Sequence, residues 1–201
     1  MQNKTAGRLS LGTDTAMAFM IGCLLIGVLL GTLSYCFMPH ELTDKLAEAG
    51  REHIAFRQTS DLGHILIDSF FTASLFIAAE GLLGFFAFGQ IPALLLPVFR
   101  GIGLGTVLSM VYNTYGSPGA VYASIIIIPS AIISGIALCM AAKESVRFSS
   151  RLFVITMSSD PCRGISEMTK LYCVRLLSAE AAVAASAAAD CIFSLIFAAK
   201  I

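Results

Sequence analysis

Three residues of this chain carry charge inside long apolar segments, and they are the first candidates for chemistry. Glu80 lies ten residues before Gln90, and Arg100 lies ten residues after it. If Gln90 marks a turn between two membrane helices, both side chains lie roughly 13–15 Å below the same membrane surface. Glu180 falls at nearly the same depth in a later apolar segment. The spacing predicts a buried charge layer of Glu80, Arg100 and Glu180.

This charge layer has two acids and one base, so it carries a surplus negative charge. Charge in an apolar interior is costly, and burial would therefore keep one carboxyl protonated or recruit a cation. The simplest interpretation is an ion pair that fixes how the helices are arranged. A proton or ion relay and exposure to a water-filled groove are the alternatives that the sequence leaves open.

Residues typical of enzyme sites are scarce. The three histidines all fall in or beside one polar loop: His40, His53 and His64. None of them can serve a membrane serine as a base. Asp61, His64 and Asp68 have a spacing that a weak metal site could use, but a solvated helix face is the better interpretation. The six cysteines are scattered without a CxxC pair, which is typical of small apolar residues. We therefore expect no catalytic residues, metal or cofactor.

The elements that must position these residues are apolar segments long enough to cross a membrane, which takes about 20 residues. Hydrophobic residues make up 57% of the 201 residues and charged residues 13%, too few to cover the surface of a soluble fold. This composition excludes an ordinary soluble enzyme, a disordered protein and a coiled coil. The formal net charge of zero leaves no basic field for nucleic acid. We expect an all-α polytopic membrane helix bundle.

The apolar runs predict five transmembrane helices in a single domain that covers residues 1–201. These helices cover residues 15–38, 65–88, 91–112, 120–142 and 171–197. A polar outer loop at 39–63 has leucines and alanines at helical spacing, which predicts a short amphipathic helix that stops near Gly50. A cytoplasmic polar segment at 143–170 contains Phe148 and other apolar residues, so we expect part of it to lie in the membrane interface.

Lysine and arginine residues in the loops predict the orientation. With the N-terminus in the cytoplasm, the inner side holds seven of these residues and the outer side holds four. Five helices then place the C-terminus on the outside. We therefore expect a multi-pass protein of the cell membrane with a cytoplasmic N-terminus and an extracytoplasmic C-terminus.

Glycines at helical spacing predict close packing of helices. Gly27 and Gly31 form one GxxxG pair, and Gly101 and Gly105 form another. This spacing lets two helix backbones approach each other. The run from Gly101 to Gly105 is preceded by no strand pattern and followed by no Lys-Ser/Thr, so it is not a phosphate-binding loop. The pairs are compatible with a homodimer and equally with packing inside one chain.

Two neighbouring apolar segments carry a pattern of glycine and proline. Residues 99–105 read Phe-Arg-Gly-Ile-Gly-Leu-Gly and lie within the third predicted helix. A short loop and a proline that breaks the fourth helix follow, at Gly116, Pro118, Gly119 and Pro129. The stretch 26–31 and the Ser69-Phe70 pair belong to the same pattern. Through these residues most of the chain resembles the stage II sporulation protein M family.

The resemblance implies a non-enzymatic role. In spore formers, such a protein is a membrane platform that anchors or localises extracytoplasmic peptidoglycan-remodelling hydrolases, and related proteins occur in organisms that make no spores. The polar amide that usually follows the Ser-Phe pair is absent here, and Thr72 or Ser74 stands in for it. We expect the partner contacts on the outer surface, at 39–63 and 113–119, with the lipid bilayer around the helices.

The second hypothesis is a membrane subunit of a small transporter or ion-coupled permease. The charges at Glu80, Arg100 and Glu180, with helices kinked at Pro97 and Pro129, are similar in outline to broken-helix transporters. However, the two halves of the sequence show no internal repeat, and five helices do not divide into equal halves. The sequence therefore favours the scaffold.

Overall fold

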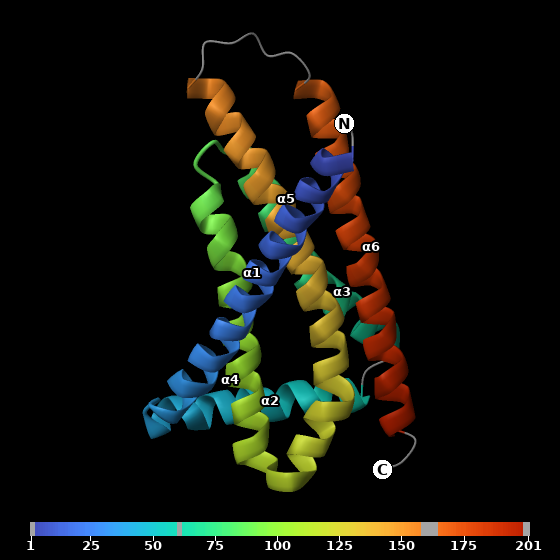
Figure 1. Ribbon diagram of the computed structural model, residues 1–201. Coiled ribbons are helices and arrows are strands. Elements are labelled where there is room, and N and C mark those ends of the chain that lie inside the picture. Colours follow the sequence, from blue (N-terminus) through green and yellow to red (C-terminus); the bar gives the residue numbers. More distant parts are fainter. Residues whose placement is uncertain (1–2, 60–61, 158–164, 199–201) are drawn as a thin grey trace.

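The computed structural model is an all-α bundle, described over residues 3–59, 62–157 and 165–198 (Figure 1). Its helices are α1 (Asn3–Cys36), α2 (His40–Thr59), α3 (Leu62–Gly84), α4 (Gln90–Tyr122), the π-helical segment η1 (Ala123–Ile127), α5 (Ile128–Met157) and α6 (Ile165–Ala198). These ranges contain no strand. The predicted all-α class is confirmed.

Four helical stretches among the described residues are long and apolar enough to cross a membrane. They are Thr15–Cys36, Gly63–Gly84, Gln90–Met157 and Ile165–Ser194. Large apolar side chains on their outer faces are exposed, among them Leu29, Phe71 and Leu177. Water would penalise such a surface, whereas lipid would not. The helices are therefore typical of a multi-pass membrane protein.

The stretch Gln90–Met157 contains 68 residues, far more than one crossing needs. It reverses direction at Gly116, whose φ of 59° and ψ of −135° are the only non-helical backbone angles inside α4. Glycine reaches such angles without the Cβ clash that other residues meet. Figure 1 shows α4 and α5 returning past each other from this reversal. The expected loop at 113–119 is thus compressed into a single bend.

The two ends of the bundle are built differently (Figure 1). At the end here named the N-terminal end, α1 begins, residues 85–89 connect α3 to α4, α5 ends and α6 begins. At the opposite end, named the α2 end, α2 lies across the bundle beside the reversal at Gly116, and α6 ends.

One expectation about the polar segments was wrong. Helix α2 does not stop near Gly50 but continues to Thr59. Gly50 packs against the side chain of Met110, where a Cβ atom would overlap, so close packing offsets the low helix propensity of glycine. The first part of the 143–170 segment belongs to α5. Helix α5 runs unbroken to Met157 with Phe148 buried, because this part of the segment packs against α3 and α6.

Helices α1 and α4 cross where the two GxxxG pairs meet. A Cβ atom at Gly27 would overlap the carbonyl oxygen of Val98 on α4, and one at Gly101 would overlap the carbonyl oxygen of Leu24 on α1. Gly31 and Gly105 make equivalent backbone contacts farther along. The four glycines therefore form one seam within a single chain, which lets the backbones touch.

Candidate functional site

A cavity of about 480 Å³ opens beneath α2 and between α3, α4, α5 and α6. Its walls are mostly apolar, but polar side chains line it from all five of these helices, with His53 on α2. They include Asp68, Thr72, Arg100, Ser134, Ser186 and Asp190. A concave, largely apolar site with a few converging polar groups is the usual form of a binding site. We therefore take this cavity, here named the α2 cavity, as the candidate functional site.

Arg100 supplies the positive charge of the α2 cavity. Its guanidinium carbon lies 5.3 Å from the centre of the Phe76 ring, a cation–π contact between α4 and α3. No ion pair to Arg100 occurs among the residues that the structure describes. A guanidinium has five N–H donors in a planar fork that matches carboxylates and phosphates. Arg100 is thus suited to hold an acidic group inside the cavity.

The acidic residues of the α2 cavity lie nearer the α2 end. Asp190 on α6 is almost fully buried and accepts a hydrogen bond of 2.5 Å from the Ser69 hydroxyl on α3. Asp68, on the same turn of α3, is exposed. Asp68 precedes Phe76 by eight residues, which separates it from the level of Arg100 by about 12 Å along the helix. The cavity therefore has a cationic inner part and an acidic mouth.

Three serine hydroxyls of the cavity, those of Ser130, Ser134 and Ser186, donate to backbone carbonyls, whereas Ser69 donates to the Asp190 carboxylate. Ser186 on α6 donates to the carbonyl of Ser130 on α5 at 2.8 Å. Ser134 donates to the Ala131 carbonyl within its own helix. A nucleophilic serine instead needs a base within hydrogen-bond reach. The Ser186 contact joins α5 and α6, and the serines bonded to carbonyls have no base as their partner.

The predicted charge layer does not assemble into one network. Glu80 is fully buried, and neither carboxylate oxygen has a hydrogen-bond partner among the described residues. Glu180 accepts a hydrogen bond of 2.8 Å from Ser74, and Arg100 lies over Phe76. The expected ion pair is therefore not formed between these side chains. Counting residues from the turn gives the height of a side chain along its helix, but it does not determine which neighbouring helix that side chain faces.

Contacts that the sequence analysis missed close the bundle at its N-terminal end. The Ser145 hydroxyl donates to the Glu80 carbonyl at 2.7 Å, and the Tyr172 hydroxyl donates to the Gly81 carbonyl at 3.0 Å. Ser149 donates to the Phe86 carbonyl at 2.6 Å. These hydroxyls supply donors to carbonyls at and beyond the end of α3. Ser145 and Ser149 are four residues apart and therefore share one helix face, and this spacing could have predicted a polar contact with a neighbouring helix.

Aromatic rings complete this closure. The rings of Phe148 and Tyr172 stack with centroids 4.5 Å apart, and Phe85 packs edge-on against both. Ser145, Ser149 and Tyr172 are buried. Contacts of α3, α5 and α6 thus close this part of the N-terminal end, whereas the α2 cavity lies between the helices beneath α2.

No metal site forms from the residues that the structure describes. His64 and Asp68 are both exposed, and Asp61, the third member of the weak metal pattern, lies outside the described residues. Five cysteines in the described ranges form no disulfide: Cys23, Cys36, Cys139, Cys173 and Cys191. Cys162 also lies outside the described residues.

Comparisons with models of known protein families, with curated proteins and with solved structures found no match to this chain. The site geometry and the pattern of residues therefore carry the functional argument.

Proposed function

We propose that the chain is a non-enzymatic scaffold of the cell membrane that binds an extracytoplasmic partner at its α2 end. One observation carries this proposal: a 20-residue amphipathic helix lies across that end with its charged face exposed. Among the α2 side chains whose exposure the structure describes, four exposed acidic residues stand against two basic ones: Glu41, Asp44, Glu48 and Glu52 against Lys45 and Arg51. An acidic face of this kind favours a partner with a basic surface.

The proposed topology has five crossings, because the long stretch Gln90–Met157 reverses at Gly116. The N-terminal end carries the basic residues that the positive-inside rule assigns to the cytoplasm. In the described residues these are Lys143, Arg147, Arg151, Lys170 and Arg175. The N-terminus is then cytoplasmic, and the α2 end and the C-terminus are extracytoplasmic. A reporter fused after Lys200 tests this arrangement, since a cytoplasmic signal from it would contradict five crossings.

The proposed partners are peptidoglycan-remodelling hydrolases outside the membrane, as the resemblance to the stage II sporulation protein M family implies. The scaffold would anchor or localise them during sporulation or other envelope remodelling. The exposed face of α2 supplies a surface for such a partner, and the α2 cavity behind it could accept a side chain from that partner. The two glycine pairs already pack against each other between α1 and α4 of one chain. A homodimer would therefore have to form through other helix faces.

A crosslinking pull-down from native membranes tests the scaffold. The variant Glu48→Lys/Glu52→Lys reverses two exposed charges one turn apart on α2. We expect the wild type to recover an extracytoplasmic wall hydrolase and this variant to lose it. The matched control is Glu167→Lys, which reverses an exposed carboxylate at the opposite end. Equal recovery by all three proteins would contradict docking on α2.

The second candidate is a subunit of a small transporter, and the observation that favours it is the position of Arg100 inside the α2 cavity. Against it, Glu80 is buried behind Ser145 and Tyr172, and neither Glu80 nor Glu180 lines the cavity. Arg100→Met and Glu80→Gln separate the two functions. Loss of proton or ion flux in these variants, with an ATPase or solute-binding subunit in the pull-down, would favour transport and contradict the scaffold.

A further inference from the structure

A second pocket, of about 80 Å³, lies at the N-terminal end between α5 and α6. Water occupies about 30 Å³ per molecule in the liquid, so this pocket has room for a group the size of a phosphate. Its rim carries Glu144, Arg147, Arg151 and Arg175, and its base is apolar or aromatic. We name it the basic pocket. It is separate from the α2 cavity and shares no lining residue with it.

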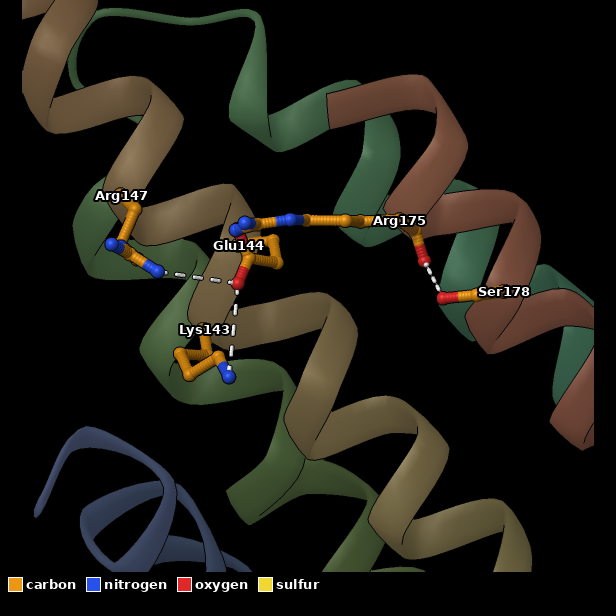
Figure 2. A network of polar contacts seen from close by, with 5 residues as sticks. All are labelled: Lys143, Glu144, Arg147, Arg175 and Ser178. Atoms are coloured by element: carbon orange, nitrogen blue, oxygen red, sulfur yellow. Dashed lines mark hydrogen bonds and ion pairs between the residues drawn. The ribbon is translucent and has the colours of Figure 1, made fainter. Parts of the chain in front are cut away.

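Glu144 organises the cations around the basic pocket (Figure 2). Its carboxylate pairs with Arg175 across the gap between α5 and α6. The same carboxylate lies 3.5 Å from Arg147 and 3.7 Å from Lys143. A single carboxylate thus lies within ion-pair distance of three cations. On the next turn of α6, the Ser178 hydroxyl donates to the Arg175 carbonyl at 2.7 Å.

The charge of the basic pocket is not balanced. Arg151 also lines it, is exposed, and has no ion pair in the described part of the chain. With Arg151 included, four cations stand against the single carboxylate of Glu144. The opposite charges of Glu167 and Lys170, three residues apart on α6, cancel in this count. Each arginine that pairs with Glu144 still has other N–H donors. The basic pocket therefore carries a net positive charge that an anionic group would neutralise.

The base of the basic pocket is apolar and rigid. Phe148 and Tyr172 stack face to face, and the Tyr172 hydroxyl is tied to the Ser145 hydroxyl at 2.9 Å. Beside them, Leu171 is 53% exposed, and it lies on a stretch of α6 that is long and apolar enough to cross a membrane. A charged rim above an exposed apolar surface matches a molecule with an anionic head and a hydrocarbon tail.

We propose that the basic pocket binds the phosphate of an anionic phospholipid. Arg147, Arg151 and Arg175 donate hydrogen bonds to the phosphate oxygens, and the acyl chains lie along the exposed apolar side of α6 beside Leu171. Arginine suits this role because its planar fork bonds two phosphate oxygens at once. The site lies at the end of the bundle where the proposed topology places the cytoplasmic leaflet, but its chemistry does not depend on the orientation.

Native mass spectrometry of the full chain in detergent tests this site. Phosphatidylglycerol and phosphatidylcholine with identical acyl chains are added separately, and the apparent affinity is measured for each lipid. We expect the wild type to prefer phosphatidylglycerol, and Arg147→Gln/Arg151→Gln to weaken that binding about tenfold, the loss expected for removing charge-assisted hydrogen bonds. The control Lys45→Gln/Arg51→Gln removes the same charge from α2 and is expected to bind like the wild type.

Three results would overturn the proposal. They are equal binding of the two lipids, phosphatidylglycerol binding by Arg147→Gln/Arg151→Gln within twofold of the wild type, and an equal loss in the α2 control. Displacement of the lipid by millimolar inorganic phosphate would overturn the choice of a lipid over a free anion. If the double variant does not fold, Arg151→Gln keeps every ion pair to Glu144. That single variant is expected to weaken binding about threefold.

Discussion

The two ends of the bundle treat polar groups in opposite ways. At the N-terminal end, Ser145, Ser149 and Tyr172 are buried and bonded to carbonyls of α3 and the following turn. At the α2 end, Arg100 and Asp68 line a cavity beneath the amphipathic helix α2. Buried polar groups that are fully bonded stabilise one arrangement, whereas polar groups in an open cavity remain available to a ligand. The contacts between α3, α5 and α6 at the N-terminal end are thus typical of a rigid closure, whereas the polar groups of the α2 cavity remain open to a ligand.

The largest expected effect comes from the α1–α4 seam, which supports both ends. Gly101→Ala places a methyl group against the Leu24 carbonyl and should lower the free energy of unfolding by about 3 kcal/mol, because backbone cannot move aside as a side chain can. Thermal unfolding in detergent measures this loss. Gly103→Ala is the matched control on the same helix, since a Cβ there meets nothing within 4 Å. Equal stability of the two variants would contradict the seam.

The bend at Gly116 is expected to be the next most sensitive position, and it acts at the α2 end. Gly116→Ala forces a side chain into a region of backbone angles suited to glycine, at a cost of about 2 kcal/mol. Denaturant unfolding followed by circular dichroism measures the change. Gly22→Ala is the control, because Gly22 is helical and its Cβ would meet nothing within 4 Å. If Gly116→Ala lowered the free energy of unfolding no more than Gly22→Ala does, the reversal would tolerate a side chain and the prediction would be wrong.

The closed N-terminal end predicts a smaller but specific loss. Ser145→Ala removes the buried hydroxyl that bonds the Glu80 carbonyl and the Tyr172 hydroxyl, which should cost about 1.5 kcal/mol. The same unfolding assay applies. Ser150→Ala serves as the control, because its hydroxyl only bonds the Val146 carbonyl within α5. Equal free energies of unfolding for the two variants would contradict a stabilising role of the buried hydroxyl at the N-terminal end.

The smallest effect is expected in the α2 cavity. Arg100→Met removes a cation that has a ring contact but no ion pair among the described side chains, so the free energy of unfolding should change by less than about 1 kcal/mol. A double-mutant cycle with Phe76→Leu isolates the Arg100–Phe76 coupling. A coupling well above that size would mean that Arg100 serves the fold instead of a ligand.

Local patterns predicted the helical class, the apolar crossings and the packing role of Gly27, Gly31, Gly101 and Gly105. Each of these properties depends on residues close together in the sequence. Glu144 escaped attention because its importance comes from Arg175, which lies on a different helix. The low helix propensity of glycine predicted that the helix would end at Gly50. The helix continues because Gly50 packs closely against Met110, a contact that a sequence pattern does not show.

The sequence by itself determined how far along a helix each residue lies, since the rise per residue is constant. It placed Glu80 and Arg100 at one height on that basis. Only the tertiary structure decided that Glu80 is buried between helices while Arg100 lines the α2 cavity. The direction that a side chain faces relative to its neighbours depends on how several helices pack, and that packing is set by contacts between residues far apart in the chain.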